Sequence, residues 1–195
     1  IHNIRFINQD LEFSKNYPPI WELLLESKKK IGIFGSLQSY PPINNKNVEF
    51  YLPDTFAPNS LAYPKEIMKF QDFNLNLVSE NKAISRRIKK SQIFTFLKLL
   101  IQNTISKRSA LACFAQVAKE FFNSKYKKRR SMIQSVISFD LYFKFLEKTN
   151  TDFSTYFTNH LAGMMHRYWK DLFPQDFGMS FKDVDKFNTK SIIKA

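Results

Sequence analysis

The apolar residues of this chain follow two different periods, and the clearest change between them lies near the C-terminal end. Phe153, Thr155 and Phe157 alternate with more polar residues, which is typical of a mostly buried β-strand over 153–158. From residue 161 onward the apolar positions recur every three or four residues, which predicts a helix that contains His166. Ligands of open α/β sheets bind where strands end and helices follow, so this stretch is a candidate site.

A second strand is expected near the start of the chain, directly after a helix. Pro18 and Pro19 suit a helix start, and an apolar stripe at helical spacing follows over 20–27. The lysines at 28–30 complement the negative end of that helix. The run IGIFGSL at 31–37 is short and continuously apolar, as in a strand buried on both faces of a parallel sheet.

The two ends of the chain are expected to meet in one sheet. VEFYL at 48–52 has the composition of a third strand, and the prolines of PDTFAPNSLAYP keep the segment after it from being helical. We expect 31–37 and 153–158 to be parallel neighbours. The ring of His166 would then point into the crevice above the ends of these strands.

The middle of the chain has helical periodicity and no strand signal. Helices are predicted to begin at Pro64 and to cover 84–101, 110–122 and 132–146. This is far more helix than a crossover between two strands needs, which indicates an inserted helical cap. The fold is predicted to be α/β, a partial parallel sheet flanked by helices, with these parts: an α/β core segment at 1–63, the helical insertion at 64–148, and a second core segment at 149–195.

Composition supports a globular protein with one sizeable core. Of the 195 residues 44% are hydrophobic, and 16% of the chain is aromatic. A single cysteine, Cys113, excludes a disulfide within the chain and is expected to be a small buried apolar residue rather than a reactive thiol. No apolar run reaches the roughly 18 residues of a membrane span, and no signal peptide is visible. The last predicted helix, within 181–195, has no stop signal, so we expect the natural protein to continue.

The chain carries a formal charge of +13, which attracts phosphates, anionic polymers and acidic membrane surfaces. Its basic residues cluster at 28–30, 86–90 and 125–130. Such runs occur as solvated helix faces and helix ends. The other interpretation is a basic helical module that binds nucleic acid or anionic lipid through 86–90 and 125–130, although no recognised nucleic-acid module surrounds these runs.

Histidines and carboxylates near the last strand are the residues that could bind a metal ion. His166 is either a metal ligand or a packed residue hydrogen-bonded to a neighbour. His160 lies six residues earlier and does not form an i, i+4 pair with it, but both would face one pocket if the strand ended between them. Carboxylates near this helix could supply oxygen ligands, or be caps and surface charges: Asp152, Asp171 and Asp176. The sequence contains no G-x-S-x-G elbow, P-loop, G-x-G-x-x-G, H-E-x-x-H or paired-cysteine zinc pattern.

Two stretches resemble the alkaline phosphatase superfamily, especially its type I phosphodiesterase and nucleotide pyrophosphatase branch, which is related to the sulfatases. In IWELLLESKKKIGIFGSLQSYPP, a helix and a strand lead into a short loop that ends in Tyr-Pro-Pro. FSTYFTNHLAGMMHRYW is similar to the strand of that branch that ends in Asp-x-x-x-His, followed by an aromatic residue and Trp. PDTFAP and a helical insertion between two strands fit the same arrangement.

The resemblance implies a metal site that is altered in this chain. In that superfamily the Asp and the His bind one of two metal ions, commonly zinc, and a Thr or Ser nucleophile attacks phosphorus or sulfur. His166 matches the histidine ligand, whereas the position of the Asp is occupied by Ala162. Loss of an anionic ligand weakens a divalent-cation site, and Asn159 or His160 would replace it only through a shifted geometry.

The resemblance also implies that parts of the active site lie outside this chain. Nothing in 1–17 matches the nucleophile, and the second metal pair of the family would follow position 195. The expected function is therefore that of an internal fragment of a metal-dependent hydrolase of anionic phosphate or sulfate esters, inactive by itself. The alternatives are a superfamily pseudoenzyme, a transferase acting on surface polymers, and the basic module described above.

Overall fold

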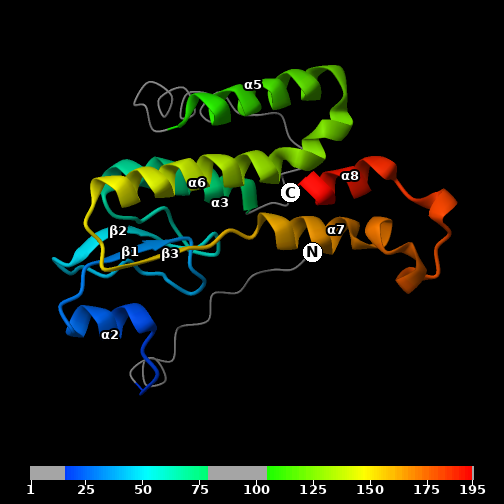
Figure 1. The fold of residues 1–195 in the computed structure, drawn as a ribbon. Coiled ribbons are helices and arrows are strands. Elements are labelled where there is room, and N and C mark those ends of the chain that lie inside the picture. The colour runs from blue at the N-terminus through cyan, green and yellow to red at the C-terminus, as the bar shows by residue number, and fades with distance from the viewer. Residues whose placement is uncertain (1–15, 79–104, 195) are drawn as a thin grey trace. The chain divides into compact units, whose positions relative to one another are not determined.

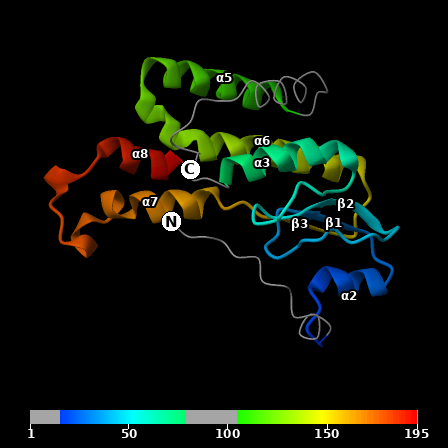
Figure 2. The same ribbon diagram turned by 180° about the vertical axis from the view of Figure 1, so that it is seen from behind.

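The chain is an α/β protein, as the sequence predicts. The computed structural model describes residues 16–78 and 105–194, which contain six α-helices and one three-stranded parallel sheet (Figures 1 and 2). Contacts divide the chain into two compact units: unit 1 is Ile1–Leu75 with Phe145–Tyr156, and unit 2 is Asn76–Lys144 with Phe157–Ala195. These limits differ from the predicted boundaries at 63/64 and 148/149, and the division into domains stays a prediction.

Each described β-strand and α-helix overlaps a segment that the sequence predicts, whereas the short 3-10 helices at 124–129 and 174–177 lie where the sequence predicts none. The strands are β1 (Ile31–Phe34), β2 (Val48–Leu52) and β3 (Phe153–Tyr156). The α-helices are α2 (Ile20–Glu26), α3 (Met68–Val78), α5 (Lys107–Phe122), α6 (Arg130–Lys148), α7 (His160–Leu172) and α8 (Lys186–Lys194). Short 3-10 helices are η1 (Lys65–Ile67), η2 (Ser124–Arg129), η3 (Pro174–Phe177) and η4 (Phe181–Asp183). The predicted helix at 84–101 and most of 1–17 lie outside the described residues.

The sheet has the order β2-β1-β3, with β1 in the centre. β1 pairs in parallel with β3 from Ile31↔Phe153 to Phe34↔Tyr156, and it also pairs in parallel with β2. The predicted pairing of the first strand with the last is therefore confirmed. Because all three strands run in one direction, their carboxyl ends meet at one edge of the sheet.

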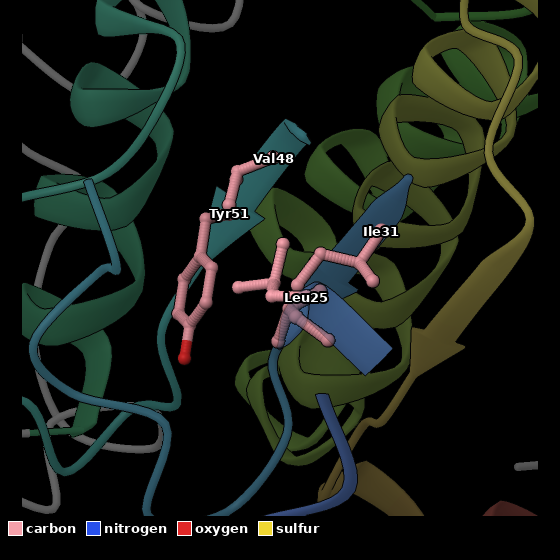
Figure 3. Close-up of a cluster of buried hydrophobic side chains, with 5 residues drawn as sticks. Leu25, Ile31, Val48 and Tyr51 are labelled. Atoms are coloured by element: carbon pink, nitrogen blue, oxygen red, sulfur yellow. The ribbon is translucent and has the colours of Figure 1, made fainter. Parts of the chain in front are cut away.

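One face of the sheet in unit 1 packs against α2. Ile31 of β1 points toward Leu25 of α2, and both belong to a cluster with Val48 and Tyr51 of β2 (Figure 3). Ile33, two positions after Ile31 and so on the same face of β1, belongs to the same cluster. All five are buried. The apolar stripe that predicts α2 from sequence is the side of the helix that covers the sheet.

The opposite face of the sheet is built from aromatic rings and one glycine. Phe34 packs against Phe70 of α3 with ring centroids 6.3 Å apart, and Phe50 packs against Phe145 of α6 at 5.8 Å. The ring of Phe50 lies directly over Gly32, where an added Cβ would come within 2.2 Å of it. The register between β1 and β2 shifts by one residue after Ile31, which places Val48 and Tyr51 on the α2 side although they are three positions apart.

The described part of unit 2 consists of helices and the turns between them. In its C-terminal part, Met164 and Tyr168 of α7 and Ile192 of α8 form a buried apolar cluster. In its other part α5 and the following α6 are joined by η2 in a helical hairpin (Figures 1 and 2). No helix in the described part of the chain is long and apolar enough to cross a membrane.

Candidate functional site

The candidate site in unit 1 is the edge of the sheet where β1, β2 and β3 end. Parallel sheets bind ligands at this edge because loops from several strands converge there. Three stretches reach it: the loop at 35–42 after β1, Pro53 to Phe56 after β2, and the last residues of β3. They include the Tyr-Pro-Pro sequence and the first four residues of PDTFAP, two sequences on which the family resemblance depends.

The loop after β1 is fixed to both neighbouring strands. The backbone N–H of Gly35 donates to the carbonyl oxygen of Leu52, 2.7 Å away. The hydroxyls of Ser36 and Thr155 lie 2.7 Å apart and form a hydrogen bond between the loop and β3. Gly35 and Gln38 both have positive φ angles, of 75° and 57°, and these let the chain turn sharply off the strand. Ser36 is thus held at the junction of two strands.

Asp54, the second residue after β2, supplies a carboxylate at this edge. It is buried, and its two oxygens accept hydrogen bonds from the backbone N–H groups of Gln38 and Phe56. The side-chain amide of Gln71 donates to the backbone carbonyls of Pro53 and Asp54, so the segment is held from α3 as well. With two backbone N–H groups bound to its oxygens, the Asp54 carboxylate holds the loops after β1 and β2 together.

Tyr51 and Tyr63 flank the same edge. The two residues pair through their backbones in an antiparallel bridge, with N···O distances of 2.6 and 2.8 Å. Burial raises the pKa of the Tyr51 hydroxyl, and the charges of Glu22 and Asp54 raise the pKa further. Tyr51 therefore stays protonated at neutral pH and is a hydrogen-bonding group rather than a base.

The sequence did not single out Ser36, Asp54 and Thr155 as site residues. The signal that would have found them is position: each stands at or just after the carboxyl end of a strand, where polar residues are exceptional in an otherwise apolar pattern. Chemically the edge offers hydroxyls and one buried carboxylate. Among the described residues, no group of three or more His, Cys, Asp or Glu side chains is placed to hold a metal ion.

The two candidate histidines lie in unit 2, on one helix. His160 is the first residue of α7, and its Nδ1 lies 3.3 Å from the hydroxyl of Thr158. His166 is in the same helix with an exposed side chain. The strand ends at Tyr156, before both histidines, so both belong to the helix. Six positions along an α-helix correspond to a rotation of about 120°, and His160 and His166 therefore lie on different sides of α7. That His166 points into the crevice at the sheet edge stays a prediction.

Two of the three candidate carboxylates have structural partners. Asp152 accepts a hydrogen bond from the backbone N–H of Lys30 at 2.8 Å, which lowers the pKa of its carboxyl. Asp171 is buried between α7 and α8, where Asn188 donates to it at 2.7 Å and the backbone N–H of Asp185 donates at 3.1 Å. Asp176 is exposed in η3. In this structure, Asp152 therefore binds the backbone at Lys30, before β1, and Asp171 joins α7 to α8 and to the residue before it.

The basic run at 125–130 is largely used inside unit 2. Arg130 forms an ion pair with Glu120, with an N···O distance of 2.6 Å and both side chains nearly buried. Arg129 donates to the hydroxyl of Ser191, and Lys128 forms an ion pair with Asp185 at 3.2 Å. Three of the charges that could have formed a nucleic-acid surface thus hold helices together, and the run at 86–90 lies outside the described residues.

Cys113 is buried in α5, and burial together with the charge of Asp140 raises the pKa of its thiol to about 11. A thiol with this pKa is neutral at physiological pH, which agrees with the predicted packing role.

Comparison of the chain with protein-family models, with curated proteins and with solved structures finds no match.

Proposed function

We propose that this chain is a segment of a metal-dependent hydrolase of phosphoric or sulfuric esters, related to the type I phosphodiesterase branch of the alkaline phosphatase superfamily. The observation that supports this best is the parallel pairing of β1 with both β2 and β3. It brings the Tyr-Pro-Pro loop, the PDTFAP segment and the FSTYF strand to one sheet edge. These are the stretches whose order along the sequence resembles that branch.

The role proposed for the edge residues is positioning. Asp54 binds two backbone N–H groups of the loops, and Ser36 and Thr155 join the β1 loop to β3. In this proposal they fix the loops that surround an anionic ester, and the positive charge of the chain favours such a substrate.

In this proposal, a complete zinc site includes ligands that lie outside the described residues. A catalytic zinc ion takes three protein ligands, whereas His166 has only the methyl group of Ala162 one turn before it. Within 16–78 and 105–194, no three or more His, Cys, Asp or Glu side chains come together as they would around a metal ion. We therefore propose that tight zinc binding and turnover require parts of the protein beyond these residues.

The test compares the isolated chain with the protein of the complete reading frame. Both are assayed with bis-p-nitrophenyl phosphate, p-nitrophenyl phosphate and p-nitrophenyl sulfate, and zinc content is measured by elemental analysis. Zinc-dependent turnover of at least one ester by the complete protein only is the expected result. Turnover by the 195 residues alone would contradict the proposal that parts are missing.

A complete protein that is folded and cleaves none of the three esters would support one of the alternatives instead. A pseudoenzyme would transfer nothing, whereas a transferase would move a group to an added polymer acceptor. The basic-module alternative predicts retention on heparin that falls steeply with salt. That binding would have to depend on residues other than Lys128, Arg129 and Arg130, which have partners within unit 2.

A further inference from the structure

Helix α5 has its polar side buried and its apolar side exposed. Ser109, Cys113 and Gln116 are at most 8% exposed. The opposite side carries an outer stripe of exposed apolar residues: Leu111 (70% exposed), Val117 (50%), Phe121 (87%) and Phe122 (85%). This is the reverse of an ordinary surface helix, and exposed apolar patches of this kind mark interaction sites.

The orientation of α5 is fixed by the polar groups on its inner side. Gln116 donates from Nε2 to the backbone carbonyl of Tyr126 at 2.6 Å and to the carboxylate of Glu120 at 3.0 Å. Glu120 in turn accepts two hydrogen bonds from the guanidinium of Arg130, at 2.6 and 2.9 Å. Turning the helix to bury the outer stripe would break this nearly buried network and leave its charges without partners, so the exposed stripe is a built feature of unit 2.

The charges around the outer stripe restrict what can cover it. Residues 105–130 contain eight basic residues and one acidic residue, Glu120, and five of the basic residues remain when Lys128, Arg129 and Arg130, which have partners within unit 2, are set aside. Exposed basic side chains stand at both ends of α5: Lys107 and Arg108 at its start and Lys119 near its end. A second copy of the chain would bring like charges together, and a nucleic acid would leave the phenylalanines in water.

We propose that α5 docks on an anionic membrane surface, with the outer stripe inserted at the boundary of headgroups and acyl chains. A helix with Phe and Leu on one side and Lys or Arg around them binds in the plane of such an interface. The basic residues at its ends contact the lipid phosphates. This proposal concerns unit 2 and does not depend on the hydrolase proposal.

The first experiment measures co-sedimentation of the full chain with vesicles of phosphatidylcholine, with and without about 30% phosphatidylserine. The variant L111S/F121S changes two exposed residues, and its affinity for the anionic vesicles is expected to fall by at least about tenfold. The matched control F177S/F181S removes two exposed phenylalanines of η3 and η4 in the same unit, which are 54% and 63% exposed, and should bind like wild type. Equal binding by wild type and L111S/F121S would overturn the proposal.

The second experiment separates the charge from the apolar contact. The triple variant K107Q/R108Q/K119Q keeps the outer stripe and should lose about fivefold in affinity for anionic vesicles per neutralised charge. Its small affinity for pure phosphatidylcholine should not change. Undiminished binding to anionic vesicles would show that these residues do not face the lipid and would overturn the proposed orientation.

The third experiment asks whether something else covers the stripe. In the C113S background, F121C supplies a single thiol for an environment-sensitive dye such as a nitrobenzoxadiazole. The expected result is emission typical of water without vesicles and a blue shift when anionic vesicles are added. Emission already blue-shifted in the free monomer, a dimer by light scattering that L111S/F121S abolishes, or a shift produced by duplex DNA instead of vesicles would each overturn the proposal.

Discussion

Asp54 is the side chain on which the sheet edge of unit 1 most depends. Both carboxylate oxygens accept backbone N–H groups from different segments, so removal of the side chain leaves two partly buried donors without acceptors. We expect Asp54→Ala to lower the free energy of unfolding by about 2–4 kcal/mol, and Asp54→Asn, which keeps one acceptor, by about half as much. Urea denaturation of the two variants measures this.

The exposed Asp176 supplies the control for that comparison, since Asp176→Ala should change stability by less than about 0.5 kcal/mol. If Asp54→Ala lowers the free energy of unfolding no more than Asp176→Ala does, the hydrogen bonds of Asp54 do not hold the loops. The sequence could not have ranked the two aspartates, because both stand in polar, proline-marked loops and only the folded chain buries one of them.

Asp152 allows a prediction of pH dependence. The N–H of Lys30 lowers the pKa of its carboxyl, with a smaller contribution from the charge of Lys29. A carboxyl group with a lowered pKa stabilises the fold above its unfolded value of about 3.9, and that contribution is lost as the pH falls through the folded pKa. We expect Asp152→Asn to melt below wild type at neutral pH.

The difference in melting temperature between the two proteins should then close as the pH falls below about 4, because wild-type Asp152 becomes neutral as well. Melting curves between about pH 7 and pH 2 test this. A difference that stays constant across the range would show that the charge of Asp152 is not what matters. Asp152 is exposed, so the expected shift is small and screened by salt.

Gly32 tests how β1 and β2 pack against the helices. A methyl group at this position would come within 2.2 Å of the ring of Phe50, which is itself fully buried against Phe145. We expect Gly32→Ala to destabilise the protein by about 1–3 kcal/mol through overpacking. Phe50→Leu in the same chain should recover part of the loss, since it removes the atoms that clash.

Gly163 is the matched control, because an added Cβ there meets nothing within 4 Å. In the middle of α7, Gly163→Ala should stabilise the protein by about 0.5–1 kcal/mol through helix propensity alone. Thermal melts of the two variants should therefore shift in opposite directions. If the melting temperatures of both variants shift in the same direction, the close approach of Phe50 does not prevent a larger residue at position 32.

The helices and strands could be predicted well because each has one dominant period. β1, β2 and β3 are short apolar or alternating runs between turn residues, and α5, α6 and α7 repeat at three and four residues. The parallel neighbours β1 and β3 were predictable because a strand after a helix and a strand before a helix are typical of α/β units. Which side of α5 is buried was not predictable, because periodicity locates an apolar stripe but assumes that it faces inward.

The site was predicted less completely than the fold. Histidines attract attention in a sequence, whereas Ser36, Asp54 and Thr155 are marked there only by their positions near strand ends. The hydrogen bonds that give them a role form only when three distant strands end side by side. The ion pair between Glu120 and Arg130 likewise joins charges that the sequence shows only as part of a basic run. Local patterns specify elements, but the chemistry of an edge or an interface depends on contacts between residues far apart in the chain.

For the protein as a whole, the metal hypothesis depends on one position. Ala162 and His166 are one turn apart on α7 and therefore lie on the same side of the helix. An Asp at 162 would restore the Asp-x-x-x-His pattern of the resembling family. The hydrolase proposal predicts that, in the protein of the complete reading frame, Ala162→Asp raises zinc occupancy and His166→Ala lowers it, because each change would add or remove one ligand of the proposed ion.

Elemental analysis after dialysis against a weak chelator measures both effects. Ala162→Asn is the control, since it has nearly the shape of Asp without its charge and should gain much less zinc. If Ala162→Asp gains none while the protein stays folded, position 162 does not face a metal site and the resemblance does not extend to metal chemistry. If it gains zinc and His166→Ala removes that zinc, the family's ligand geometry is present in the backbone of α7, and the natural alanine is the reason for any weakness of the site.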